Sequence, residues 1–224
     1  MSSAVDDSTI STEEGDQPDG SENGYQTPQK PNYLEMWHNR LLRQNLVGSI
    51  ITWAMSSFNF FMLTFFMKYF PGNIFENSLC FALSDLVAFI MSGVVSKYLR
   101  VANGFRLAFI ISISGGILYL MFSKRIEYIP VFVVLCRIGV TMAFNLGYIS
   151  VPRLFPIKFQ STVYAVVNFF AHLIACMGPI VAELDTPIPF MAFLSAVGVS
   201  VLATLLLQEL DQNEQQIKAT PTAN

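Results

Sequence analysis

Three ionisable side chains occur inside long apolar runs of this 224-residue chain, namely Asp85, Arg137 and His172. At membrane depth each would cost roughly 3 kcal/mol or more, so each needs a structural or functional reason. Such groups line a polar cavity that binds a solute or relays a proton, or they pair and lock two helices together. Both interpretations stay open for Asp85 and Arg137, whereas a single histidine is more typical of a hydrogen-bonded packing residue.

The composition predicts a membrane protein. Hydrophobic residues make up 53% of the chain and charged residues 13%, about half of the ~25% that soluble domains carry. Eight of the 16 acidic residues lie in the first 43 positions, and apolar runs of about twenty residues follow. The lipid bilayer is therefore the expected partner, and no basic patch suggests a nucleic-acid partner.

The apolar runs predict an all-α protein with six transmembrane helices, each long enough for a hydrocarbon core of ~30 Å. The expected spans are 46–70, 78–98, 105–123, 129–151, 161–182 and 187–208. Pro152 and Pro156 are expected to end the fourth span, because proline cannot donate a backbone hydrogen bond. Together the spans form a six-helix bundle over 44–208.

The flanking segments have different compositions. Residues 1–29 are acidic and poor in apolar residues, so we expect a disordered tail. Residues 30–43 could form an interfacial helix that Asn32 caps, with Trp37, Arg40 and Arg43 at the membrane surface, or a solvated linker. Residues 209–224 form a second polar tail.

The positive-inside rule predicts the orientation. Nine basic residues fall on the side of the termini: Lys30, Arg40, Arg43, Lys97, Arg100, Arg106, Arg153, Lys158 and Lys218. Three fall on the other side: Lys68, Lys124 and Arg125. Both termini are therefore expected in the cytoplasm, with the choice between plasma membrane and organelle left open.

The sequence does not favour enzyme chemistry. Ser114 and His172 superficially suit an intramembrane protease, but Ser114 lacks the glycine pattern of that class. The three cysteines have no metal-ligand spacing and are interpreted as small buried hydrophobes, so no metal or cofactor is expected. The glycines within the spans are interpreted as points of close helix packing: Gly93, Gly115, Gly116 and Gly139.

Aromatic residues near polar ones suggest a binding surface in the first span. Phe60 and Phe61 follow Asn59, and rings in a pocket can bind an organic cation through cation–π contacts. Contact with lipid or packing against other helices is the alternative for each ring.

Residues 143–156, AFNLGYISVPRLFP, resemble the organic cation/anion transporter branch of the major facilitator superfamily. The match is to the fourth helix of the C-terminal half and the loop after it. The residues that match this branch without a gap are Ala143, Phe144, Asn145, Tyr148, Leu154 and Pro156. Weaker similarities occur in the same order elsewhere, at Trp53, Ser56 and Ser57, at Leu83 and Ser84, at Gly104 and Arg106, and at Pro179.

The chain also departs from the family pattern. Arg153 stands where the family has a glutamate and Gln160 where it has an arginine, which puts the usual cytoplasmic charge contacts in doubt. Asp85 lies one turn before Ala88, the position of a family glutamate. His172 replaces a basic residue that faces the family's cavity.

The resemblance implies one half of a twelve-helix transporter, in which substrate binds between two six-helix halves. We therefore expect alternating-access transport of a small, charged organic solute with a second half, either another copy or a separate N-terminal half. A non-transporting membrane subunit and an incomplete transporter fragment are the alternatives. The expected binding residues are Asp85, Arg137, His172, Asn59, Phe60, Phe61, Asn145 and Tyr148, and the expected cytoplasmic loop motif is Gly104, Arg106, Arg153, Pro156 and Gln160.

Overall fold

The computed structural model describes residues 33–70, 73–122, 129–185 and 187–209. The 1–29 tail, the Asn32 cap and most of the 209–224 tail lie outside these residues. No strand occurs within the described ranges, which are helical almost throughout. The elements are α1 (Tyr33–His38), α2 (Arg40–Phe66), η1 (Met67–Tyr69), α3 (Ile74–Tyr98), α4 (Val101–Phe122), α5 (Ile129–Leu154), α6 (Ile157–Ala175), α7 (Met177–Ala182), α8 (Ile188–Ala203) and η3 (Thr204–Leu206).

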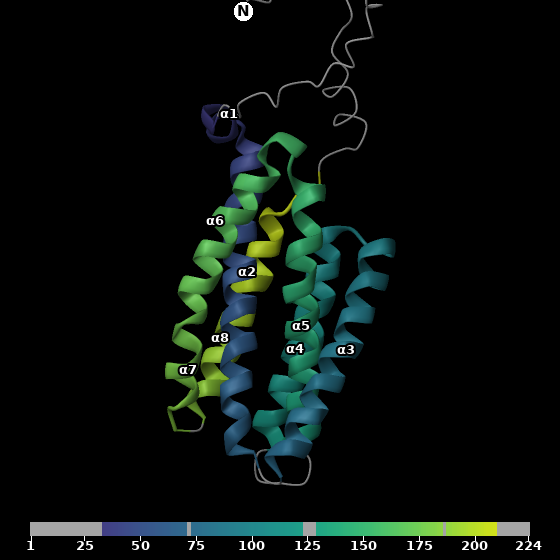
Figure 1. Ribbon diagram of the computed structural model, residues 1–224, viewed down its shortest axis with the longest axis vertical. Helices are drawn as coiled ribbons and strands as arrows, with labels where there is room; N and C mark the ends of the chain where they lie inside the picture. Colours follow the sequence, from purple (N-terminus) through teal and green to yellow (C-terminus); the bar gives the residue numbers. More distant parts are fainter. Residues whose placement is uncertain (1–32, 71–72, 123–128, 186, 210–224) are drawn as a thin grey trace, which may run out of the picture.

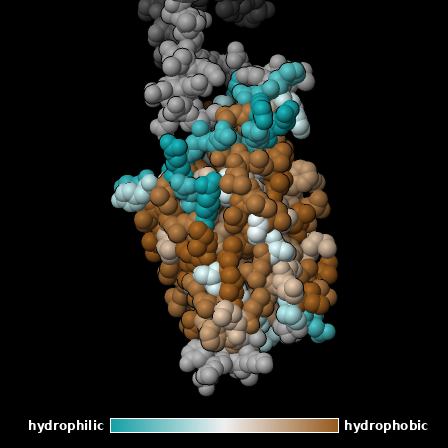
Figure 2. All heavy atoms as spheres, turned by 180° about the vertical axis from the view of Figure 1, so that it is seen from behind, coloured by the Kyte–Doolittle hydropathy of each residue, from teal (hydrophilic) through white to brown (hydrophobic). Residues whose placement is uncertain are grey.

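Among the described residues, six helical stretches are long and apolar enough to cross a membrane, as the sequence predicted. They are Arg40–Tyr69, Ile74–Tyr98, Val101–Phe122, Ile129–Leu154, Ile157–Ala182 and Ile188–Leu206. On the back of the bundle, a broad hydrophobic band covers most of the height, with hydrophilic residues gathered mainly at one end (Figure 2).

The helices form two layers (Figure 1). Helices α2 and α5 are central, with α6 packed on α2 and α3 packed on α5. Helix α8 packs behind α2, and α4 packs behind α5. We call the surface of α6, α2, α5 and α3 that faces the viewer in Figure 1 the front face.

Helix boundaries follow from local hydrogen bonds. The Leu41 amide donates to Asn39 Oδ1 at 3.0 Å, so Asn39 caps α2 and separates it from α1. Within the described part of the 30–43 segment, α1 therefore ends at His38 and α2 already begins at Arg40. Asn73 caps α3 in the same way, accepting from the Phe75 amide at 3.0 Å.

The fourth span ends about one turn later than predicted. Helix α5 continues to Leu154 with Pro152 inside it, and Pro156 precedes α6. A proline removes only one backbone donor, so the helix continues where another donor serves the freed carbonyl.

Basic residues gather at the end of the bundle that holds α1 and the α3–α4 and α5–α6 junctions. They are Arg40, Arg43, Lys97, Arg100, Arg106, Arg153 and Lys158. At the opposite end Lys68 forms an ion pair with Glu183, which also accepts from the Tyr69 hydroxyl. Lys68 and then Tyr69 hold the pKa of Glu183 below its usual value.

Glycines let α4 and α5 approach closely. A Cβ on Gly139 would lie 2.6 Å from the Ala108 carbonyl oxygen and 2.6 Å from the Ser112 nitrogen. A Cβ on Gly115 would lie 2.7 Å from the Cys136 nitrogen, which supports the predicted packing role of both glycines. Gly93 differs, since a Cβ there would meet nothing within 4 Å.

Replacing Gly139 by Ala should destabilise the bundle by about 1–3 kcal/mol, because backbone atoms of α4 block the added methyl group. Gly93→Ala is the matched control and should cause no loss of stability. Thermal unfolding of the purified chain in detergent measures both. Equal effects of the two substitutions would contradict the close approach of α4 and α5.

Candidate functional site

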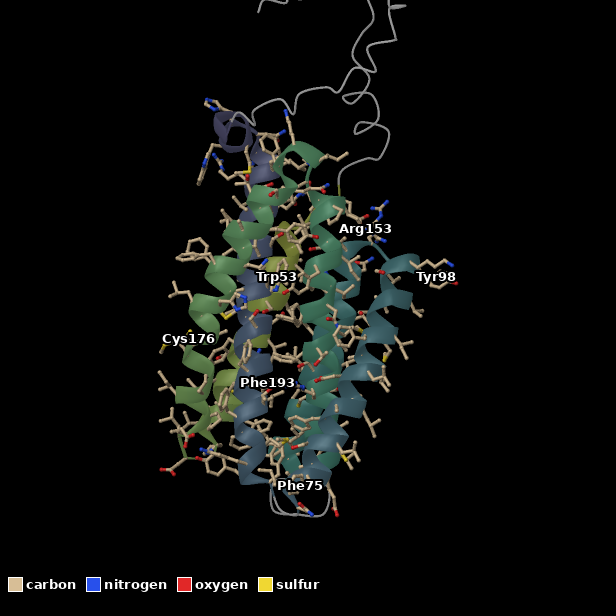
Figure 3. The ribbon with its side chains drawn as sticks, viewed as in Figure 1. Trp53, Phe75, Tyr98, Arg153, Cys176 and Phe193 are labelled. Carbon is tan, nitrogen blue, oxygen red and sulfur yellow. The ribbon has the colours of Figure 1, made fainter. Side chains whose placement is uncertain are left out.

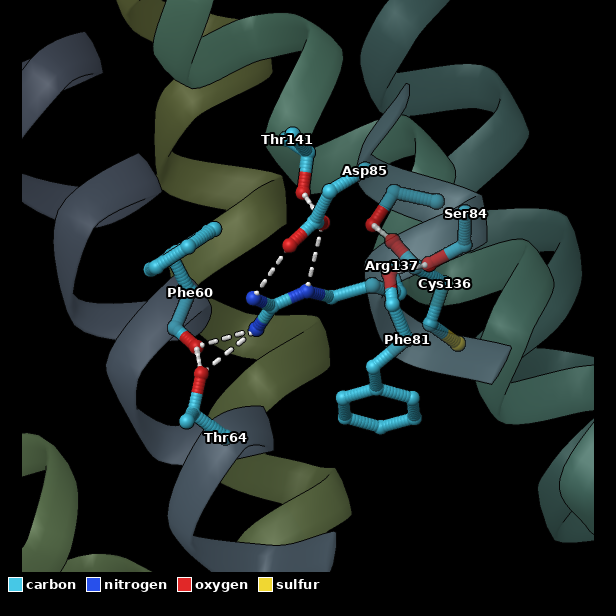
Figure 4. A network of polar contacts seen from close by, with 9 residues as sticks. Phe60, Thr64, Phe81, Ser84, Asp85, Cys136, Arg137 and Thr141 are labelled. Atoms are coloured by element: carbon cyan, nitrogen blue, oxygen red, sulfur yellow. Dashed lines mark hydrogen bonds and ion pairs between the residues drawn. The ribbon is translucent and has the colours of Figure 1, made fainter. Parts of the chain in front are cut away.

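Arg137 and Asp85 form a bidentate ion pair between α5 and α3 (Figure 4). Arg137 Nε donates to Asp85 Oδ1 at 2.9 Å, and its second terminal nitrogen donates to Oδ2 at 2.9 Å. The Thr141 hydroxyl, one turn along α5, also donates to Asp85 Oδ1 at 2.7 Å.

The remaining terminal nitrogen of Arg137 binds α2. It donates to the Phe60 carbonyl at 2.9 Å and to the Thr64 hydroxyl at 2.6 Å (Figure 4). The guanidinium carbon also lies 3.8 Å from the centre of the Phe60 ring and 5.2 Å from that of Phe81. One side chain therefore joins α2, α3 and α5.

The two partners of this pair differ in exposure. The Arg137 side chain is 4% exposed, whereas that of Asp85 is 23% exposed. Asp85 therefore offers the accessible part of the pair, since the arginine is enclosed by three helices.

A connected row of aromatic rings extends from the ion pair along the front face. Phe60 stacks on Phe144 at 5.4 Å, and Phe144 meets Tyr148 edge-on at 5.5 Å. Phe61 joins the row through Phe60 at 5.5 Å. The row is accessible, because Tyr148 is 41% exposed and the three phenylalanines are half-buried. We call Phe60, Phe61, Phe144 and Tyr148 the aromatic surface.

Trp53 supports the aromatic surface from inside the bundle. Its ring centre lies 4.4 Å from that of Tyr148 and 6.2 Å from that of Tyr164 on α6. The ring is 2% exposed, and the middle of Figure 3 shows it within the bundle. A Cβ on Gly147 would lie 3.0 Å from this ring, so glycine makes room for it.

His172 does not join the Asp85–Arg137 network. It is exposed on α6, and no hydrogen bond or ion pair of its imidazole occurs among the described residues. Helix α6 buries a ridge of residues against α2: Val163, Val167 and Ala171. The residue after each member of this ridge lies about 100° further round the helix. These residues are Tyr164, Asn168 and His172. Because Tyr164 contacts Tyr148 of α5, this edge of α6 lies on the front face.

Asn59 and Asn145 are buried rather than open to the front face, at 1% and 7% exposure. Asn59 Oδ1 and Asn145 Nδ2 have no hydrogen-bond partner among the described residues. The structure thus brings Asp85, Arg137, Phe60, Phe61 and Tyr148 into one connected set. Of the other three predicted binding residues, His172 stands on the edge of the front face and the two asparagines lie inside the bundle.

Sequence reasoning missed several polar residues of this region. Thr64 lies four residues after Phe60, and Thr141 four residues after Arg137, so helical spacing could have indicated both. Asn45 was missed too: its side chain binds the Leu154 carbonyl at 3.3 Å and both backbone groups of Gln208. These bonds join α2, α5 and the segment after η3 at the basic end.

The residues of the predicted loop motif do not form one site. Gly104 and Arg153 line a shallow hollow between the α3–α4 junction and α5, and Figure 3 shows Arg153 near the upper end of α5. Arg106 instead binds Asn103 at 3.1 Å, and Gln160 donates to the Phe155 carbonyl at 3.0 Å. Pro156 precedes α6.

Ser114 donates to the Ile111 carbonyl of its own helix at 2.7 Å, and no described contact joins it to His172. Cys136 is buried as predicted, but Cys80 and Cys176 are exposed, and Figure 3 shows Cys176 on the outside of the bundle. No group of three metal-binding side chains occurs within the described ranges.

The chain is similar to two curated transporters. Solute carrier family 22 member 15 of Xenopus tropicalis is 26% identical over 191 residues, covering 80% of this chain and 36% of that protein. Human organic cation/carnitine transporter 2 is 24% identical over 187 residues, covering 81% of this chain and 33% of that protein. No protein-family model matches. The predicted resemblance to the organic cation/anion transporter branch is thus confirmed at low identity, and the chain spans about a third of each relative.

Asp85→Ala should destabilise the chain by about 3–5 kcal/mol, because it leaves the enclosed Arg137 charge without its partner. Arg137→Ala should cost less, since the exposed part of Asp85 can be hydrated. The double variant should recover much of the Asp85→Ala loss. Thermal unfolding in nanodiscs measures all three.

The matched control is Glu76→Ala, which removes an exposed acid from the first turn of the same helix. It should change stability by no more than about 0.5 kcal/mol. If Asp85→Ala behaves like this control, the ion pair does not hold the bundle.

Proposed function

We propose that this chain forms one half of a transporter that carries a small, charged organic solute across a membrane by alternating access. The observation that carries the proposal is the front face, where a partly exposed carboxylate adjoins a row of accessible aromatic rings. The two curated relatives, named as a solute carrier and an organic cation/carnitine transporter, support transport of organic solutes.

A polar front face at membrane depth is unfavourable against lipid. Asp85 and His172 lie on this face, whereas the outer, apolar flank of α6, about 100° further round the helix, carries exposed residues such as Phe169 and Leu173. The asymmetry favours a polar cavity or a protein partner in front of α2 and α5. The proposed partner is a second six-helix half, either another copy or a separate chain.

The aromatic surface supplies the contacts for the solute in this proposal. Phe60, Phe144 and Tyr148 offer ring faces and edges, which bind organic groups and can favour a positive charge. Asp85 adds a carboxylate whose charge Arg137 balances. Rocking of this bundle against its partner would then expose the surface to each side of the membrane in turn.

The proposed orientation places both termini in the cytoplasm. The basic residues gathered at the α1 end support it, because positively charged loops are retained on the cytoplasmic side. The multi-pass topology itself rests on the six apolar helices.

A non-transporting membrane subunit is the second candidate, and the fully hydrogen-bonded guanidinium of Arg137 favours it. All three guanidinium nitrogens already have partners, as expected of a pair that only locks helices together. Transport that survives loss of Asp85 and of the aromatic surface would support this candidate.

Phe144→Ala should raise the KM for uptake of a transported organic ion roughly tenfold, because a stacked ring of the binding surface is lost. Phe169→Ala on the apolar flank of α6 is the matched control and should leave uptake unchanged. Proteoliposome uptake of labelled organic cations and anions, at matched folded abundance, measures both.

Crosslinking and mass analysis of the tagged chain in native membranes tests whether the chain associates with a second six-helix half. A homodimer or a complex with another six-span chain is expected. A monomer that takes up solute, or a complex whose uptake is indifferent to Phe144→Ala, would contradict the proposal.

A further inference from the structure

Pro152 leaves a gap in the hydrogen bonds of α5. In an α-helix the amide of residue 152 would donate to the carbonyl of residue 148, four positions earlier. Proline has no amide hydrogen, and its ring also pushes against that carbonyl. The Tyr148 carbonyl therefore loses the donor that the helix would normally provide.

The Tyr164 hydroxyl fills this gap from another helix, since it donates a hydrogen bond to the Tyr148 carbonyl. Tyr164 lies beside the ridge that α6 buries against α2, so its backbone position is fixed by that packing. A bond that is usually internal to one helix thus joins α6 to α5.

The same two tyrosines enclose Trp53. The Trp53 ring meets Tyr148 edge-on at 4.4 Å and Tyr164 edge-on at 6.2 Å. Gly147, the residue before Tyr148, adjoins the Trp53 ring at a distance where a Cβ would already lie at 3.0 Å. A change in the position of the Tyr148 carbonyl would therefore also displace the Trp53 ring and the exposed Tyr148 ring.

We propose that Tyr164 is a positioning residue for the aromatic surface. Its hydroxyl replaces the donor that Pro152 removes, and so holds Tyr148 against Trp53 at the edge of the binding surface. The role in binding rests on the proposed function, whereas the replacement of the donor does not.

The proposal makes Pro152 and Tyr164 interdependent. With Pro152 present, Tyr164→Phe leaves the Tyr148 carbonyl without a donor. In a Pro152→Ala chain the amide of residue 152 can donate within the helix, so the loss of the phenol hydroxyl should matter little. A merely structural tyrosine would be equally important in both backgrounds.

The experiment is a double-mutant cycle with Trp53 as the reporter. The chain has two tryptophans, so Trp37→Phe leaves Trp53 as the sole indole. Tyr164→Phe, Pro152→Ala and their combination are compared in this background, with Tyr98→Phe as the control at an exposed tyrosine. Trp53 emission, acrylamide quenching and the unfolding equilibrium are measured in nanodiscs.

Tyr164→Phe should shift Trp53 emission and raise the unfolding equilibrium constant about fivefold, the usual scale of one hydrogen bond. The combination with Pro152→Ala should return both towards the Pro152→Ala values, and Tyr98→Phe should change neither. If Tyr164→Phe alone does not fold, folding of the combined variant is the rescue that the proposal requires. Equal effects of Tyr164→Phe in both backgrounds, no effect in either, or failure of both to fold would overturn it.

Uptake gives a separate readout. Tyr164→Phe should raise KM more than it lowers kcat, and Pro152→Ala should reverse that change. If neither the variants nor the wild-type chain transports solute, even with the partner present, the proposed function fails. The Trp53 double-mutant cycle still decides the role of Tyr164 in that case.

Discussion

The guanidinium of Arg137 is the constraint on which the rest of the bundle depends. A buried cation inside an apolar protein is tolerated only when its donors are paired and its charge is balanced. Asp85 from α3 and the Phe60 carbonyl and Thr64 hydroxyl from α2 meet that demand around α5. The positions of three helices are thereby fixed relative to one another, and Phe60 is fixed where the aromatic surface begins.

The front and back of the bundle are packed differently. Behind α5, Gly115 and Gly139 allow backbone contact with α4, which gives a closely packed and apolar back. In front, α3 and α6 each bury only a narrow ridge, and Asp85 and Tyr148 beside them stay partly accessible. A rigid back and an open front suit a unit that moves as one body against a partner.

The helices and their order could be predicted from the sequence, because an apolar run of about twenty residues rarely forms anything other than a transmembrane helix. The Asp85–Arg137 pair was one of two interpretations from sequence, and helical spacing alone could not say that the two side chains meet. The asparagines could not be placed, since a polar residue on a central helix faces a neighbour or the open side depending on helix rotation. Helix α5 continues through Pro152, and Tyr164 of the next helix supplies a donor to the carbonyl that the proline leaves free, a contact between two helices that helical spacing alone does not indicate.

The proposed transport role requires a front face that does not contact lipid. Spin labels at positions 168 and 169 of α6, in a cysteine-free chain reconstituted in liposomes, test it by their collision rates with oxygen and with a polar nickel reagent. The label at position 168 should be shielded from oxygen or reached by nickel, while the label at position 169 should be reached mainly by oxygen. Equal, oxygen-dominated accessibility at both positions would mean that lipid covers the front face and would rule out the proposed binding surface.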